Sequence, residues 1–136
     1  MKSAIVSDAL AAKFFTEKET PYTRFVAAEG LNIISGLYVP SLHEVELKPW
    51  ARRGGNAVFI NHDASRTTND CYVMEIPAGQ KLTPHRQLFE ETIFVLSGRG
   101  STTVWNDGGD KISFEWGAGA IFGIPLNAHH QHFNGS

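Results

Sequence analysis

A cluster of polar side chains directly before an apolar run is the feature that most constrains this chain. In residues 79–98, His85, Gln87 and Glu91 each carry a nitrogen or oxygen atom that can bind a metal ion. The apolar run from Ile93 to Leu96 follows, and a serine and a glycine close it. Such a run predicts a buried strand. We therefore expect a group of potential metal ligands that is held in place by a rigid strand.

A second stretch, residues 119–134, carries further ligand-type histidines. His130 and His132 occupy alternate positions after an apolar run. Alternate residues of a strand point to the same face, so both imidazoles are expected on one side of a strand. His129 would point to the opposite face, and we interpret it as structural.

The spacing of these residues resembles the paired motifs of the cupin superfamily. The first family motif is matched by Gly79, His85, Glu91 and Gly98, and the second by Gly119, Pro125, His130 and Asn134. Gln87 stands where the first motif has its second histidine, and Asn127 stands where the second motif has a glycine. Asparagine tolerates a left-handed backbone conformation well, so we expect the turn at Asn127 to be retained.

Resemblance to cupins implies a divalent metal ion inside a barrel. Carried over position by position, the implied ligands are His85, Gln87 in place of a histidine, Glu91 and His130, with His132 as an alternative ligand. Two imidazoles and one carboxylate leave open positions on the metal, as in the facial triad of non-haem iron sites. Iron or manganese is favoured because an amide oxygen is a harder ligand than imidazole, with zinc or nickel as alternatives. Gln87 could instead hydrogen-bond a metal-bound water, and a barrel that has lost its metal is the remaining alternative.

The rest of the chain predicts short strands that are separated by glycine-rich turns. Asn106 to Gly109 is a strong hairpin signal. The predicted strands cover residues 31–39, 45–48, 57–60, 71–76, 101–105, 111–116 and 121–125. This pattern indicates an all-β barrel or sandwich. The cupin resemblance narrows it to a double-stranded β-helix, the jelly-roll barrel of that superfamily.

One helix is predicted, from Ser7 to Lys18, with an apolar face formed by Leu10, Ala11, Phe14 and Phe15. We divide the chain into an N-terminal helical segment, residues 1–22, and a cupin barrel, residues 23–136. The second motif ends where the sequence ends, whereas cupins normally continue into a further strand. We therefore expect a barrel that is truncated at its C-terminus, or the first barrel of a two-barrel protein.

The bulk composition argues against several classes of partner. The formal net charge is −2 and the basic residues are scattered, so a nucleic-acid surface is not expected. No apolar run approaches the length of a membrane span, and no signal-peptide core follows Met1. Cys71 is the single cysteine and cannot form an internal disulfide, so we expect a reducing, cytoplasmic location.

Three local features are open to two interpretations each. The basic turn from Trp50 to Gly55 is interpreted as a solvated loop, with contact to an anionic substrate or a subunit as the alternative. Cys71 is interpreted as a small buried strand residue rather than a nucleophile. Arg86 and Arg99 either lie at the surface or anchor a substrate carboxylate.

From these observations we expect a metal-dependent cupin enzyme that acts on a small organic molecule, with dioxygenase-like oxidoreductase chemistry. The alternative is a non-catalytic barrel that binds or senses a small ligand, or the structural half of a two-barrel protein. Lyase or isomerase chemistry is a further alternative, because a fold does not determine a function. A homodimer is also expected, because barrels of this kind often pair through sheet edges or N-terminal segments.

Overall fold

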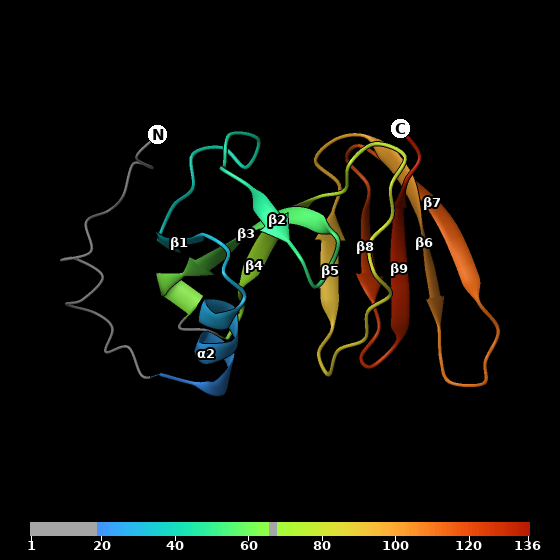
Figure 1. Ribbon diagram of the computed structural model, residues 1–136, viewed down its shortest axis with the longest axis horizontal. Coiled ribbons are helices and arrows are strands. Elements are labelled where there is room, and N and C mark those ends of the chain that lie inside the picture. The colour runs from blue at the N-terminus through green and yellow to red at the C-terminus, as the bar shows by residue number, and fades with distance from the viewer. Residues whose placement is uncertain (1–18, 66–67) are drawn as a thin grey trace. The chain divides into compact units, whose positions relative to one another are not determined.

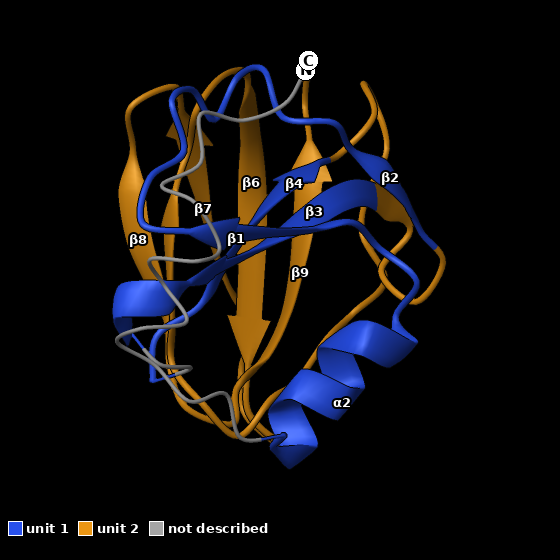
Figure 2. Cartoon of the chain, turned by 90° about the vertical axis from the view of Figure 1, so that its left-hand side faces the viewer, with its two compact units in different colours: residues 1–50, 56–75 blue, residues 51–55, 76–136 orange. Residues whose placement is uncertain are grey.

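The computed structural model describes residues 19–65 and 68–136, and strands dominate this part of the chain (Figure 1). The chain divides into two compact units, residues 1–50 with 56–75 and residues 51–55 with 76–136 (Figure 2). The prediction of an all-β fold with a short helix near the N-terminus is confirmed. The helix predicted over residues 7–18 lies outside the described residues. No helix in the described part of the chain is both long and apolar enough to span a membrane.

Helix α2 (Pro21–Ala28) opens the described part of the first unit. The Thr20 side chain caps it by accepting a hydrogen bond from the Thr23 backbone N–H at 3.2 Å. From the sequence alone, we expected the helix predicted over residues 7–18 to end before Pro21, because proline interrupts a helix interior. Proline at the first helical position instead favours a helix start, since its fixed φ suits the helix and its missing N–H is not needed there.

The first unit contains a four-stranded sheet in which β3 (Gly55–His62) is central. β1 (Ile33–Gly36) pairs with it in parallel, and β4 (Cys71–Glu75) pairs with it antiparallel. β2 (Lys48–Trp50) begins where the predicted strand over residues 45–48 was expected to end. A short 3₁₀ turn, η1 (Asp63–Ser65), follows β3.

An apolar cluster beneath α2 holds the first unit together. Its buried members are Val26, Leu31, Trp50, Ala57 and Phe59. The Trp50 ring meets the Phe59 ring edge-on with centroids 5.2 Å apart, and its indole N–H donates to the Glu29 carboxylate. Burying the indole therefore leaves no polar atom of that ring unsatisfied.

Two predictions about local exposure are wrong. The turn after Trp50 is not fully solvated, because Arg53 is only 2% exposed and Trp50 only 5%. Trp50 packs against the rings of Phe59 and Tyr72, and these contacts could not be inferred from the turn itself. Cys71 lies in a strand as predicted, but it is exposed rather than buried, because it is the first residue of β4.

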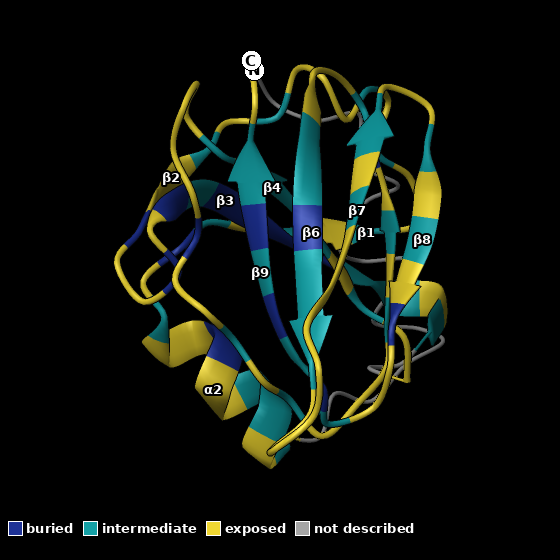
Figure 3. Ribbon diagram, turned by 90° about the vertical axis from the view of Figure 1, so that its right-hand side faces the viewer, coloured by how far each residue is buried: buried dark blue, intermediate teal, exposed yellow. Residues whose placement is uncertain are grey.

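The second unit contains two antiparallel sheets, and Figure 3 shows β9, β6 and β7 of the larger one side by side. A two-stranded sheet pairs β5 with β8, and a three-stranded sheet has the order β7-β6-β9. The strands are β5 (Glu91–Phe94), β6 (Arg99–Trp105), β7 (Ile112–Gly117), β8 (Ile121–Ile124) and β9 (His129–Asn134). The predicted hairpin turn at residues 106–109 joins β6 to β7, and the Gly109 backbone N–H donates to the Asn106 carbonyl.

Aromatic contacts join the two sheets of the second unit. Phe122 of β8 lies 5.1 Å from Phe114 and 6.4 Å from Trp116, both on β7, measured between ring centroids. It also lies 6.2 Å from the His132 ring of β9. The sheets therefore face each other across an aromatic interior, as in a β-sandwich or jelly roll.

The segment before β5 runs along the free edge of β9. Isolated bridges pair Lys81 with Phe133 and His85 with His130. His85 and His130 exchange two backbone hydrogen bonds of 2.8 Å each. The two sequence stretches that carry potential ligands are thus fastened to each other by their backbones.

Candidate metal centre

Glu91, His130 and His132 form a compact cluster in the second unit. One ligand atom from each residue lies within 4.8 Å of those of the other two. Glu91 starts β5 in the two-stranded sheet, whereas both histidines come from β9 in the three-stranded sheet. As predicted, the alternation of β9 places His130 and His132 on one face, with ring centroids 5.2 Å apart.

His130 is the most enclosed member of the cluster, with no exposed surface. Its Nδ1–H donates to the Ala128 carbonyl at 3.2 Å, because a carbonyl can only accept. Burial lowers the pKa of His130, so the ring is neutral and its Nε2 carries a lone pair. This Nε2 makes no hydrogen bond among the described residues, and it lies 3.7 Å from Glu91 Oε2.

His132 is held through its other nitrogen. Its Nδ1 lies 2.7 Å from the Thr102 hydroxyl, and the side chain is 7% exposed. Burial, with smaller effects from His130 and Arg53, lowers the pKa of His132 to about 3. The ring is therefore neutral at physiological pH.

His85 and Gln87 lie beside the cluster and bond to each other. His85 Nε2 and Gln87 Oε1 are 2.8 Å apart, so the imidazole N–H donates to the amide oxygen. The His85 and His130 ring centroids are 5.4 Å apart. Burial, followed by the nearby charge of Arg53, lowers the pKa of His85 to about 4. Of the four ligands that the resemblance implies, the structure places Glu91 and His130 in the cluster, where the alternative ligand His132 joins them. The other two, His85 and Gln87, lie beside the cluster and bond to each other.

Arg53 supplies positive charge to this region. Its side chain is 2% exposed, and its charge is among the causes that lower the pKa values of His85, His130 and His132. This contribution was missed from the sequence, where Arg53 was assigned to a solvated turn. The adjacent Gly54 and Gly55 were the only local signal of a compact turn at this position.

A surface network ties the ligand-bearing stretches to the β6–β7 hairpin. Arg86 contacts Asp107 at 2.9 Å and donates through Nε to the Asn127 side chain at 2.8 Å. His129 lies 2.8 Å from the other Asp107 oxygen and stacks on Trp105. Hydrogen bonds from His129 and Arg86 hold the pKa of Asp107 below its usual value. Arg86 and His129 thus have surface structural roles.

The donor set of the cluster fits a divalent metal ion. Two neutral imidazoles and a carboxylate are ligands that iron, manganese and zinc all accept in proteins. The 3.7 Å spacing of His130 Nε2 and Glu91 Oε2 suits two atoms that each lie about 2.1 Å from one shared ion. A buried lone pair that faces a carboxylate oxygen also has no favourable partner other than a cation or a proton.

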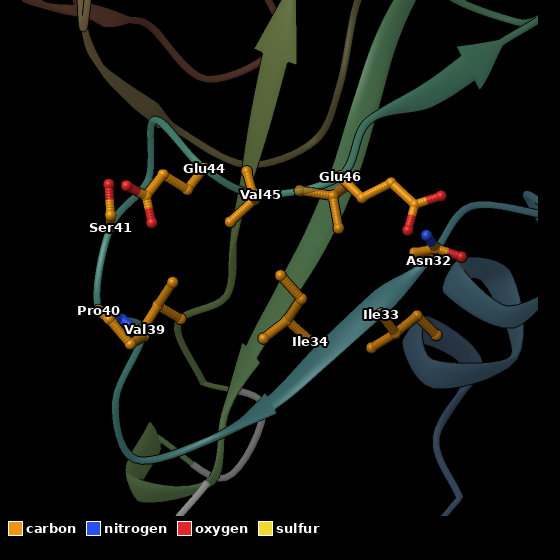
Figure 4. Close-up of a pocket in the computed structure, with 10 residues that line it drawn as sticks. Asn32, Ile33, Ile34, Val39, Pro40, Ser41, Glu44, Val45 and Glu46 are labelled. Atoms are coloured by element: carbon orange, nitrogen blue, oxygen red, sulfur yellow. The ribbon is translucent and has the colours of Figure 1, made fainter. Parts of the chain in front are cut away.

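A hollow of about 300 Å³ lies in the first unit (Figure 4). The side chains of Ile34, Val39 and Val45 line it, with Glu44 and Glu46 among its polar residues. None of the described residues that line it is a histidine or cysteine. It therefore lacks the mixed nitrogen and oxygen donor set of the cluster in the second unit.

Comparison with known proteins finds a distant similarity to a dioxygenase. The chain is 29% identical over 76 residues to 5-aminosalicylate 1,2-dioxygenase from Comamonas sp. The aligned stretch is 56% of this chain and 19% of that protein, so it spans about a fifth of the relative's length. No protein-family model matches the sequence. The similarity is thus distant, and it concerns a dioxygenase.

Proposed function

We propose that this chain is a metal-dependent, cupin-type enzyme domain that acts on a small organic molecule with dioxygenase-like chemistry. Glu91, His130 and His132 would hold a divalent ion, with iron or manganese favoured. The observation that carries the proposal is the buried Nε2 lone pair of His130 facing Glu91 Oε2 at 3.7 Å. The distant similarity to a dioxygenase supports the reaction class.

The chain's own residues prepare the cluster for an ion. The bond from His130 Nδ1–H to the Ala128 carbonyl fixes that ring and directs its lone pair toward Glu91. Burial keeps both cluster histidines neutral, which a metal ligand requires. Phe122, packed beside His132, helps to exclude water from this side of the cluster. When bound, the metal would supply open coordination positions and Lewis acidity toward a substrate.

A non-catalytic barrel that binds a small ligand is the second candidate. The bond between Gln87 and His85 favours it, because this bond engages a nitrogen that the cupin resemblance assigns to the metal. With His85 engaged in this way, the cluster lacks one ligand that the cupin resemblance implies.

Metal analysis and oxygen uptake together test the proposed function. The purified chain would be reconstituted with Fe²⁺ or Mn²⁺ and supplied with a panel of small aromatic and aliphatic acids. Substrate-dependent oxygen consumption that is lost in Glu91→Gln supports a dioxygenase. Stoichiometric metal with ligand binding but no turnover of any panel member would favour the binding barrel. A chain that takes up no metal contradicts the metal-dependent enzyme.

The expected homodimer and cytoplasmic location stay predictions. We place the dimer contact on the N-terminal segment, residues 1–22, because barrels of this kind often pair through such segments and the helix predicted there has an apolar face. Light scattering on the full chain and on a variant that lacks residues 1–18 would test this. An unchanged number of subunits in the shortened variant would exclude the segment as the dimer contact.

A further inference from the structure

We propose that Thr102, held in place by Trp116, is a positioning residue that places the proton of His132 on Nε2 in the metal-free protein and keeps the ring oriented when a metal binds. The inference rests on the proposed metal site. Thr102 and Trp116 themselves supply no ligand atom to that site. The hydroxyl of Thr102 would let the His132 ring change its protonated nitrogen without losing its hydrogen-bond partner.

The position of Trp116 depends on the absence of a side chain at Gly100. Trp116 of β7 is the register partner of Gly100 on β6, and its indole crosses that glycine. A Cβ at Gly100 would lie 2.4 Å from Trp116 Cη2 and 2.1 Å from the Phe133 carbonyl oxygen. Glycine at position 100 therefore leaves room for the indole, whose Nε1–H reaches Thr102 on the same strand.

Thr102 connects the indole to the metal cluster. It has no exposed surface, and it is the register partner of His132 on β9. Its Oγ1 accepts from Trp116 Nε1–H at 2.9 Å and lies 2.7 Å from His132 Nδ1. Among the described residues the hydroxyl has no other hydrogen-bond partner. The partly buried Trp116 and the buried Thr102 are thus joined by hydrogen bonds in a series that ends at the buried His132.

The donors and acceptors in this series of hydrogen bonds determine which ring nitrogen of His132 carries the proton. An indole N–H can only donate, so Trp116 uses one lone pair of the Thr102 oxygen. The hydroxyl proton then has His132 Nδ1 as its acceptor, which leaves the proton of the neutral ring on Nε2. In the metal-free protein, the proton of His132 therefore lies on Nε2, the nitrogen that the proposed site needs as a ligand atom.

A hydroxyl can also hydrogen-bond to the ring when the ring carries its proton on Nδ1. When Nδ1 carries the proton, Thr102 Oγ1 accepts from it with its second lone pair, and His132 Nε2 is free to bind a metal. A backbone carbonyl could support only this form, and valine could support neither. Thr102 thus keeps the His132 ring oriented whether its Nε2 donates a hydrogen bond or acts as a ligand.

Nitrogen NMR of the ¹⁵N-labelled, metal-free full chain tests the first step directly. The His132 signals would be assigned by their loss in His132→Gln. We expect Nε2 to carry the proton in the wild type and in Thr102→Ser, which keeps the hydroxyl. In Thr102→Val, the hydrogen-bonded Nδ1 signal should be lost. A proton on Nδ1 in the metal-free wild type would overturn the proposal.

Titration with Zn²⁺, a diamagnetic probe, tests the second step. Zinc should move the His132 proton to Nδ1, and its affinity should fall about 10–100-fold in Thr102→Val, the usual effect of losing a partner behind a metal-binding histidine. Thr102→Ser should stay near the wild-type affinity. Thr102→Val with unchanged zinc affinity and unchanged His132 signals would overturn the proposal.

Two controls separate this inference from misfolding and from failure of the metal site. Trp116→Phe keeps the Thr102 hydroxyl, so it should lose less zinc affinity than Thr102→Val if the variants have similar melting temperatures. An equal or larger loss in Trp116→Phe would count against Thr102 as the positioning group.

If the wild type binds no zinc, the proposed metal site fails. The metal-free spectra of wild type, Thr102→Ser and Thr102→Val then still decide the form of His132.

Discussion

His130 Nε2 lies 3.7 Å from Glu91 Oε2, too far for a hydrogen bond and with a lone pair on the imidazole side. The opposite nitrogen of the ring donates to the Ala128 carbonyl, so rotation of the imidazole would break a buried bond. Glu91 and His130 come from different sheets of the second unit, and both sheets must be formed before these atoms meet. The pair therefore links folding of this unit to assembly of the candidate site.

Stability of the metal-free chain should fall as the pH is lowered from about 6.5 to 4. Burial lowers the pKa of His85 to about 4 and that of His132 to about 3, against 6.5 for a free histidine. In this window the unfolded chain binds protons that the folded chain excludes, so acid favours unfolding. Urea unfolding across this range would measure the loss. The variant His132→Gln should show a shallower dependence, and a wild-type stability that rises toward pH 4 would contradict the assignment.

Gly100→Ala should destabilise the chain by about 1–3 kcal/mol or more, the usual range for overpacking. The added Cβ would meet the Phe133 carbonyl oxygen at 2.1 Å and the Trp116 ring at 2.4 Å. Gly117→Ala is a matched control on the neighbouring strand, where a Cβ would meet nothing within 4 Å. Denaturant unfolding of both variants checks this expectation. Equal stabilities would show that the close approach at Gly100 is relieved by small shifts.

Asn127→Ala should cost about 1 kcal/mol, because alanine disfavours the left-handed backbone conformation. Asn127 has φ of 60° and is the one non-glycine residue with positive φ among those the structure describes. Asn127→Gly removes the same bond to Arg86 but keeps the backbone conformation accessible. Thermal unfolding should therefore place Asn127→Gly above Asn127→Ala. The reverse order would mean that backbone strain does not dominate at this turn.

Gln87→Leu should leave metal binding at the cluster in place. The Gln87 side chain contacts His85 rather than Glu91, His130 or His132 among the contacts of the described residues. Losing this amide releases His85 Nε2 without removing a cluster ligand. Equilibrium dialysis with Mn²⁺ would compare this variant with the wild type. Complete loss of binding in Gln87→Leu would make Gln87 itself a ligand.

Much of the second unit could be predicted from sequence because its signals are local. Alternation placed His130 and His132 on one face, the Asn-Asp-Gly-Gly turn marked the β6–β7 hairpin, and Asn127 adopts the expected conformation. The role of His85 could not be predicted, because it depends on whether the Gln87 amide turns toward a metal or toward the neighbouring ring. Three-dimensional packing, rather than the spacing of the residues in the sequence, determines the direction of the Gln87 amide.

Other features escaped prediction because their partners are remote in the sequence. Arg53 was placed in a solvated turn, yet it is buried. Helix α2 was missed because Pro21 was interpreted as a break rather than as a first helical residue. The bonds from Trp116 to Thr102 and from Thr102 to His132 cross between strands, and only the sheet register reveals them.

Metal content of the purified chain tests the central claim most directly. Elemental analysis after reconstitution with Fe²⁺ or Mn²⁺ would compare the wild type with His130→Ala, His132→Ala and the control His129→Ala, whose side chain faces Asp107 instead of the cluster. We expect near-stoichiometric metal in the wild type and in His129→Ala, and its loss in both cluster variants. Metal that persists in His130→Ala, or that is absent from the wild type, would contradict a centre built on Glu91, His130 and His132.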